Sequence, residues 1–397
     1  MAKADKALSG NKGEWSEIYT FFKVLTDGKL DVADDNLNAV PGEYYKIIEI
    51  LRKENERNNH YVRLDDHIHI VVPTGEGDNA EELDFSIDDF AKNSKLLFNY
   101  LKTKSGRSLK FPDIEKFMSE LRVHSIKDVG NKRDITIKIE DFHSHVKDTL
   151  GFSIKSLIGK NSTLFNAGTG TNFIFEVKFP DANNIPNVDE FNKDTYNDNR
   201  KIGSRLTKLQ EKYGASIVFR ETQSKKFQRN LQLVDSFMPR IIAEALMTYY
   251  KDGISSVSKC IAKLTELNPL GFDMEDGQPF YEYKMRRFLQ DAAMGLYAET
   301  TWMGVYDATG GQIIVKDDGD IVCYHIYEQN RFLNFLMNST RFEQAATSEN
   351  ADNPGHAREQ VKGGKTVKPF KFGWLYEDDG KYYIKLNLQI RMKDTSH

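Results

Sequence analysis

The sequence predicts a mixed α/β protein, of the α+β kind, in which helices flank a mixed central sheet. Two observations support this fold class. Apolar residues recur at helical spacing in several early segments and again over 200–295. Between 122 and 178 the spacing changes to strict alternation, which is typical of strands, and alternation returns after 311. The chain has 397 residues, of which 39% are hydrophobic, so it can bury a substantial core.

The first predicted helix, 14–26, has one continuous apolar face. This face is formed by Trp15, Ile18, Tyr19, Phe22 and Leu25. The dipeptide Asp27-Gly28 is expected to end the helix. Further helices are expected over 42–56, 86–101 and 113–121, in most of 200–295, and, as a short helix capped by Ser162 or Thr163, over 161–167.

Strands are predicted wherever apolar and polar residues alternate. They are expected over 61–72 as a strand or hairpin, and over 134–140, 151–156, 173–179, 216–220, 312–316, 320–327 and 382–391. Gly319 lies in the expected turn of a hairpin in the C-terminal, β-rich part of the chain. The polar, glycine-containing segment 345–368 is expected to be a mobile loop.

Composition excludes several classes of protein. The net charge of -4 argues against a protein that coats nucleic acid through one large basic face, although 55 lysines and arginines leave room for a local basic cleft. The two cysteines, Cys260 and Cys323, are not spaced for a zinc ribbon. The first residues lack a signal-peptide pattern, and no stretch approaches the ~20 apolar residues that span a bilayer. A cytoplasmic location without membrane contact is expected.

The segment from Asp134 to Lys155 carries the most informative chemistry. Asp134 opens one predicted strand, and Ser153 and Lys155 share a face of the next. If the two strands are antiparallel neighbours, Asp134 and Lys155 meet at one edge of the sheet. A carboxylate that binds Mg²⁺ beside a lysine that assists an attacking water is the arrangement that phosphodiester hydrolysis needs. Nucleases of the PD-(D/E)xK type have an acid where Ser153 stands, so a second carboxylate must come from elsewhere.

Four acidic residues could supply that carboxylate. Glu14 and Glu17 lie on the first helix, and Glu17 is favoured because it projects from the edge of the apolar face. Asp141 ends the Asp134 strand but lies more than about 20 Å along it. Glu176, with Lys178, forms an acid-x-Lys pair on the next strand and is the rival catalytic pair, although such a pair by itself is typical of an exposed strand edge.

Two other motifs are weaker. His143 and His145 form an HxH pair in a predicted turn, but no third ligand is near in sequence. The segment 168–171, Gly-Thr-Gly-Thr, lacks the Lys-Ser/Thr end of a phosphate-binding P-loop and is interpreted as a tight turn. Nucleotide binding there is a minor alternative.

The chain as a whole resembles the HpaII-type restriction endonucleases. The resemblance is carried by Asn-Lys-Gly-Glu-Trp-Ser-Glu-Ile-Tyr at 11–19, by the long central segments at 134–141 and 150–156, and by shorter matches through 385–391. It implies a PD-(D/E)xK-like nuclease core and a type II enzyme that hydrolyses double-stranded DNA at a short, CCGG-like site with Mg²⁺. The longer polar insertion around 345–368 departs from the expected pattern and leaves the target in doubt.

The resemblance also implies roles and partners. Asp134, Ser153 and Lys155 would be catalytic, Asp134 and Glu17 would bind metal, and many nucleases of this fold supply a glutamate from the first helix. The expected divisions are a mainly helical region at 1–110, the nuclease core at 111–265 and a DNA-recognition region at 266–397. A cognate DNA methyltransferase would protect host DNA, and a homodimer is left open. The alternative is an inactive or regulatory DNA-binding protein that kept the fold. The feature that supports this alternative is Ser153, which stands where an acid is expected.

Sequence readout is expected mainly from the C-terminal half. Guanine is read in the major groove by arginine or lysine donors. The candidates are Asn166, Arg286, Arg287, Asn330 and Arg331. Arg286 and Arg287 are more commonly solvated helix charges than base-reading residues.

Overall fold

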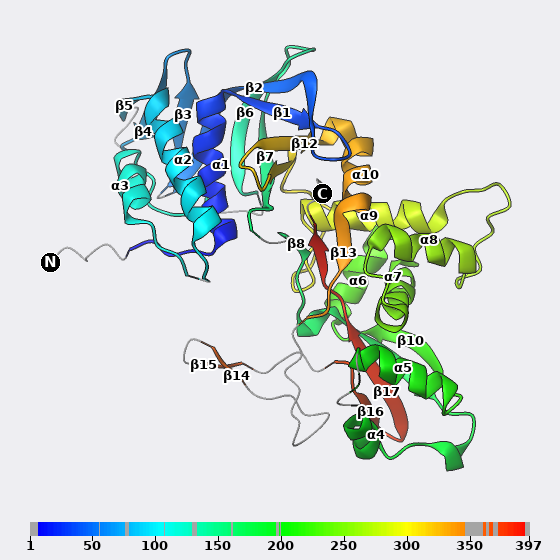
Figure 1. The fold of residues 1–397 in the computed structure, drawn as a ribbon. Helices are drawn as coiled ribbons and strands as arrows, with labels where there is room; N and C mark the ends of the chain where they lie inside the picture. Colours follow the sequence, from blue (N-terminus) through cyan, green and yellow to red (C-terminus); the bar gives the residue numbers. More distant parts are fainter. Residues whose placement is uncertain are drawn as a thin grey trace.

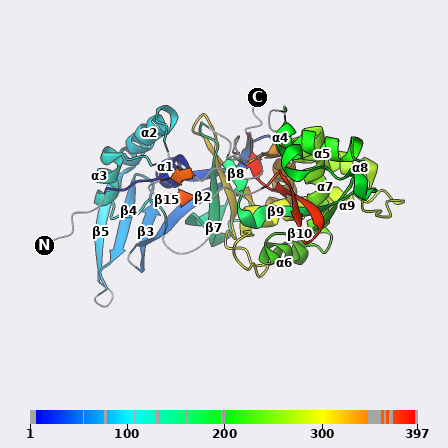
Figure 2. The same ribbon diagram turned by 90° about the horizontal axis from the view of Figure 1, so that it is seen from below.

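The computed structural model describes residues 7–393 except 55, 76–78, 107, 129–132, 160–161, 196–197, 199, 346–359, 363–364 and 368–371. Within these residues the chain forms ten α-helices and a nine-stranded sheet, which confirms a mixed α/β fold. Two hydrophobic cores define two lobes, which lie side by side in Figures 1 and 2. No helix in the described part of the chain is long and apolar enough to cross a membrane.

The first lobe contains the nine-stranded sheet, in the order β1-β12-β11-β7-β6-β2-β3-β4-β5. Its strands are β1 (Lys29–Ala33), β2 (Ala39–Glu54), β3 (Arg57–Arg63), β4 (His67–Pro73), β5 (Ala80–Ser86), β6 (Ile135–Asp141), β7 (Lys147–Ser156), β11 (Gly311–Val315) and β12 (Ile321–His325). The pairs β1–β12 and β7–β11 are parallel, and the others are antiparallel. Because β1 also pairs with β2, six strands form a closed ring of pairings.

Three helices cover this sheet and share its core: α1 (Lys12–Asp27), α2 (Ile87–Thr103) and α3 (Pro112–Glu120). Helix α1 begins with a capping box between Asn11 and Glu14 and ends at Gly28, whose φ of 65° is easy only for glycine. Trp15 is fully buried, and its indole N–H donates to the carbonyl oxygen of Leu109 at 3.0 Å. These contacts fix the N-terminal turn of α1.

The second lobe contains the remaining helices and two smaller sheets. Its helices are α4 (Val188–Asp194), α5 (Lys201–Glu211), α6 (Lys225–Val234), α7 (Met238–Met247), α8 (Val257–Leu267), α9 (Phe280–Met294) and α10 (Gln329–Ser339). Its strands are β8 (Ser162–Phe165), β9 (Asn172–Lys178), β10 (Ser216–Thr222), β13 (Thr340–Phe342), β16 (Leu375–Asp378), β17 (Lys381–Asn387) and β18 (Ile390–Met392). They form sheets in the orders β10-β9-β17-β16 and β13-β18-β8.

The hairpin of β11 and β12 joins the two lobes. Ile313 and Cys323 belong to the core of the first lobe, whereas Ile314, Val322 and Tyr324 belong to that of the second. Successive side chains of a strand point to opposite faces, so both faces of this hairpin are buried. The chain therefore returns to the first sheet after building most of the second lobe. The predicted divisions at 110 and 265 stay a prediction.

Two predicted helices are wrong. The segment 42–56 lies largely in β2, where burial alternates through Tyr45 and Ile47 and, after a bulge, resumes at Ile50. The segment 161–167 contains β8, in which Ser162 and Thr163 pair with β18 instead of capping a helix. The other predicted helices and strands of the first lobe are confirmed, as is the hairpin turn at Gly319, where φ is 94°.

The predicted mobile loop at 345–368 falls mainly outside the described residues. Within it, β14 (Gln360–Lys362) and β15 (Lys365–Val367) form a short antiparallel pair. In Figure 1 this pair lies away from both lobes.

Candidate active site

A cavity of about 620 Å³ lies where the two lobes meet, at the N-terminal end of α1. Residues from seven separate parts of the described chain line it. They include Glu17 of α1, Asp134 immediately before β6, Lys155 of β7 and Asn166 after β8. The cavity thus contains the predicted acid and the predicted lysine.

Asp134 is fixed by the strand that carries Lys155. Strands β6 and β7 are antiparallel neighbours, with Ile135 opposite Phe152, as the sequence predicts. The backbone N–H of Asp134 donates to the carbonyl oxygen of Phe152 at 2.9 Å. Its carboxylate oxygen Oδ2 accepts a hydrogen bond from the backbone N–H of Ile154 at 2.6 Å. Hydrogen bonds to β7 therefore orient Asp134. Lys155 lies on that strand, one residue after Ile154.

Ser153 occupies the position of the missing acid and is buried. Its hydroxyl donates to Oδ2 of Asp134 at 3.3 Å. The side chain therefore supports the Asp134 carboxylate by a hydrogen bond, and the second negative charge has to come from another element.

Glu17 lines the same cavity as Asp134, and the charges of the two side chains interact. Burial raises the pKa of Glu17 from 4.5 to about 8, and the negative charge of Asp134 contributes to this rise, while Lys127 and Arg52 oppose it. A like charge disfavours ionisation only when it is close. Glu17 and Asp134 are thus two acids from different elements at one cavity, and the negative charge of Asp134 adds to the effect of burial on Glu17.

Glu14 has a partner for each of its two carboxylate oxygens. Its Oε2 accepts a hydrogen bond from the backbone N–H of Asn11 at 2.7 Å, which completes the capping box. Its Oε1 lies 3.0 Å from Nζ of Lys127. Because both oxygens of Glu14 have partners, the geometry favours Glu17 as the second acid.

The other candidate acids lie elsewhere. Asp141 ends β6 at the opposite end from Asp134, and its Oδ1 accepts backbone N–H groups of the turn that follows, including that of Ser144 at 2.7 Å. Glu176 lies on β9 in the sheet of the second lobe, where it is ion-paired with Arg220. Lys178, at the exposed end of β9, is likewise outside the cavity lining.

The weaker motifs form no cluster of metal ligands among the described residues. His143 lies in the turn after β6, and Nδ1 of His145 is 3.2 Å from Oε1 of Glu140. No group of three or more His, Cys, Asp or Glu side chains in the described part of the chain could hold a metal ion by itself. The segment 168–171 forms a short turn whose Gly168 carbonyl accepts from the buried amide of Asn387 at 2.8 Å.

Among the DNA-binding candidates, Asn166 lines the cavity. The guanidinium of Arg286 donates to Glu282 of its own helix, and that of Arg331 donates to Glu43 and Glu328. Arg287 on α9 is partly buried, and Asn330 on α10 is exposed. None of these four residues lines the cavity.

The sequence did not reveal three cationic residues that line the cavity: Lys12, Lys127 and Arg391. Lys12 was visible as the first residue of a recognisable helix, beside Glu14. Lys127 lies in an irregular segment, and Arg391 lies near the end of the chain on β18. No local pattern marks these two, because tertiary contacts bring them to the cavity.

Comparison with known proteins gives a consistent result. The family model described as HpaII restriction endonuclease matches residues 11–392. The chain is 34% identical, over 386 residues, to the type II restriction enzyme HpaII of Haemophilus parainfluenzae. This match covers 97% of the chain and 98% of that enzyme. No solved structure gives a significant match.

Proposed function

Because this chain belongs to the HpaII restriction endonuclease family, we propose that it hydrolyses double-stranded DNA at a short specific site with Mg²⁺ as cofactor. The observation that carries the proposal is one cavity lined by Glu17, Asp134 and Lys155. An acid and a lysine at the ends of two neighbouring strands of a mixed sheet, with a second acid on a helix that packs on that sheet, are the parts of a PD-(D/E)xK-like core, and we propose that core for the first lobe.

The donor set fits Mg²⁺. This ion prefers oxygen ligands, keeps several waters and is commonly held by one or two carboxylates together with substrate phosphate. Glu17 and Asp134 would supply the carboxylates. Burial, and second the charge of Asp134, raise the pKa of Glu17, and a bound divalent cation would favour the ionised carboxylate. Bound Mg²⁺ would polarise the phosphate and lower the pKa of a bound water.

The residues of the chain have separate tasks in this mechanism. Asp134 and Glu17 position the metal, and Ser153 together with the Ile154 N–H holds Asp134 in one orientation. The ammonium of Lys155 orients the attacking water and stabilises the negative charge that develops on the phosphate. On each strand, hydrolysis forms a P–O bond to the attacking water and breaks the P–O bond to the leaving sugar oxygen; the proton of the water passes to solvent, and the leaving oxygen takes a proton from solvent.

The finer assignments rest on the relatedness to HpaII. We propose a CCGG-like target, a cognate DNA methyltransferase that protects host DNA, and a cytoplasmic location. A homodimer would supply one cavity for each strand of a symmetric site. Asn166 is the base-contact candidate nearest the catalytic residues, since it lines the same cavity.

Cleavage of phage DNA tests the proposal. Purified protein with Mg²⁺ should produce discrete fragments, EDTA should abolish them, and sequencing the cut ends should reveal one short recognition site. A smear would refute site specificity. Binding without cleavage at any concentration of Mg²⁺ or Mn²⁺ would support the alternative that Ser153 favours, an inactive DNA-binding protein with a nuclease fold.

A further inference from the structure

Lys127 stands at the cavity although it belongs to no helix or strand. It lines the same cavity as Glu17, Asp134 and Lys155. Its Nζ lies 3.0 Å from Oε1 of Glu14, and 62% of its side chain is exposed. An exposed ammonium beside three acids is placed to meet an anion that approaches the cavity from solvent.

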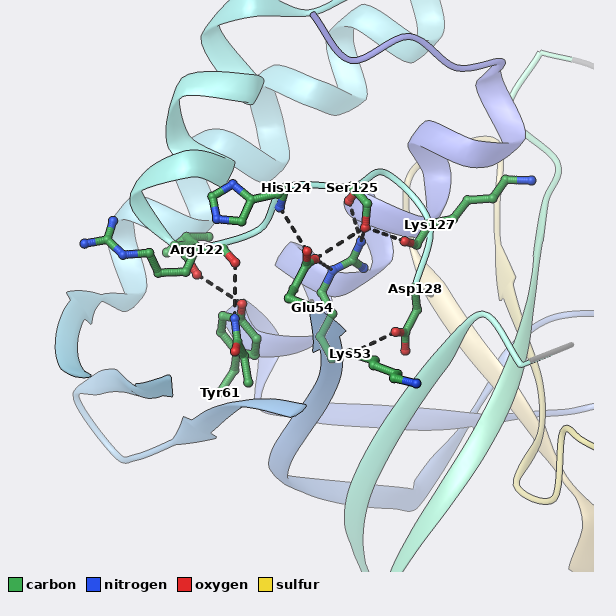
Figure 3. Close-up of polar contacts among 11 residues, drawn as sticks. Lys53, Glu54, Tyr61, Arg122, His124, Ser125, Lys127 and Asp128 are labelled. Carbon is green, nitrogen blue, oxygen red and sulfur yellow. Dashed lines mark hydrogen bonds and ion pairs between the residues drawn. The ribbon is translucent and has the colours of Figure 1, made fainter. Parts of the chain in front are cut away.

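The backbone that carries Lys127 is held rigidly. Segment 121–128 follows α3 and lies against β2 and β3 (Figure 3). At one end, the hydroxyl of Tyr61 donates to the carbonyl oxygen of Leu121 at 3.0 Å. At the other end, the backbone N–H of Lys53 donates to Oδ1 of Asp128 at 2.9 Å. The segment is therefore anchored on both sides of Lys127.

A buried ion pair anchors the middle of the segment. Arg52 and Glu54 of β2 are 5% and 6% exposed, and Nε of Arg52 lies 2.9 Å from Oε1 of Glu54. Arg52 also donates to the carbonyl oxygen of Ser125 at 2.5 Å, and Glu54 accepts from the backbone N–H of His124 at 3.3 Å. The hydroxyl of Ser125 donates to the carbonyl oxygen of Lys127 at 2.6 Å (Figure 3).

The buried pair of Arg52 and Glu54 positions the segment more than it stabilises the fold. Buried ion pairs are weak sources of stability, because desolvation offsets much of their attraction. Here the pair satisfies backbone groups of an irregular segment that no sheet or helix satisfies. Its effect is to fix the backbone of Lys127 while the long side chain reaches solvent.

We propose that Lys127 binds a backbone phosphate of the DNA next to the scissile bond. The proposal rests on the proposed nuclease function. Lys127 adds a positive charge at the edge of a cavity that also contains Glu14, Glu17 and Asp134, and this charge can meet a phosphate that approaches from solvent. Exchanging Glu14 for a phosphate costs little, because exposed ion pairs contribute little and Glu14 keeps its bond to Asn11. Lys155 remains the lysine that acts on the attacking water.

Salt dependence of DNA binding tests this role directly. Each phosphate contact contributes about one to the slope of log K against log salt concentration. Binding of target DNA by Lys127→Gln, measured in EDTA, should show a slope smaller by about one. Lys127→Arg should keep the slope, because it keeps the charge. Lys92→Gln is the matched control: Lys92 is an exposed lysine near the start of α2, whereas the cavity lies beyond the end of that helix.

Cleavage provides the second measurement. Loss of a charge-assisted contact should reduce kcat/KM by about 10-fold to 100-fold, and Lys127→Arg should recover most of it. Melting temperatures of all variants identify any loss of folding. Ser125→Ala removes the hydrogen bond to the Lys127 carbonyl oxygen. This variant should reduce cleavage mildly without changing the salt dependence of DNA binding.

Two outcomes would overturn the proposal. One is an unchanged slope in Lys127→Gln with normal cleavage. The other is an unchanged slope together with impaired cleavage that extra Mg²⁺ restores. Lys127 would then act only by its charge on Glu17 and on metal binding, and not by a phosphate contact. Failure of the proposed function is a separate result, because the unmodified protein would then not cut DNA under any of these conditions.

Discussion

Replacing Glu17 by glutamine should stabilise the metal-free protein and abolish its metal-dependent reaction. Glutamine keeps the size of the side chain but does not ionise. In the folded protein, burial first and Asp134 second raise the pKa of Glu17 from 4.5 to about 8. The unfolded chain releases this proton near 4.5, so folding at neutral pH requires uptake of a proton. The stability of the unmodified protein should therefore fall as pH rises from 4.5 to 8.

The size of the effect follows from the same values. Each pH unit in that interval costs about 1.4 kcal/mol. Over the 2.5 units between pH 4.5 and pH 7 the Glu17→Gln variant gains at most about 3.4 kcal/mol relative to the unmodified protein. It gains nothing below pH 4.5, and the gain is complete above pH 8.

Urea unfolding in EDTA at pH 5, 7 and 8.5 measures this difference. Glu120→Gln on α3 is the matched control, because Glu120 is exposed and lies outside the cavity lining. Mg²⁺ should raise the stability of the unmodified protein and have much less effect on Glu17→Gln. If the two proteins differ by the same amount at every pH, Glu17 is not the coupled acid, and the assignment of the second carboxylate is wrong.

Three further predictions follow from the cavity. Asp134→Ala and Lys155→Ala should each lower the cleavage rate by about 100-fold or more while DNA binding survives. Lys178→Ala should cleave DNA at the normal rate. The reverse pattern in a gel assay of cleavage would make Glu176 and Lys178 the catalytic pair. At limiting Mg²⁺ the cleavage rate of the unmodified protein should rise with pH up to about 8, because metal binding removes the proton from Glu17; a pH profile that is flat between 5 and 8 would contradict this role. Arg286→Gln should leave the salt slope of DNA binding unchanged, because its guanidinium is engaged by Glu282; a slope lower by about one would show a phosphate contact.

The sequence predicted the parts of the fold that local pattern controls. Helix α1 was predictable because its apolar face and its terminal Asp-Gly lie within one short segment. The β6–β7 pair was predictable because strict alternation continues up to Asp134 and Lys155. The same alternation places the predicted acid and the predicted lysine at one edge of the sheet, and both line the cavity there.

The pattern failed where tertiary contacts override it. In β2, Tyr44, Ile47, Ile48 and Leu51 recur at helical spacing, and a bulge between Ile47 and Glu49 shifts the alternation that would have indicated a strand. The same strand buries Arg52 and Glu54, which charge alone would place on the surface.

The packing of α1 explains how acids from two separate elements can lie at one cavity. Burying Glu17 beside Asp134 costs free energy, so packing elsewhere on α1 must hold the helix in place. Trp15 does so: it is fully buried, its indole N–H donates to Leu109, and its ring lies 4.9 Å from that of Phe111. The apolar face of α1 thus offsets the electrostatic cost of bringing two acids together in the metal-free protein. Because metal binding would replace the proton of Glu17, the same packing would keep both acids at one cavity for a single cation, although they lie more than one hundred residues apart in the sequence.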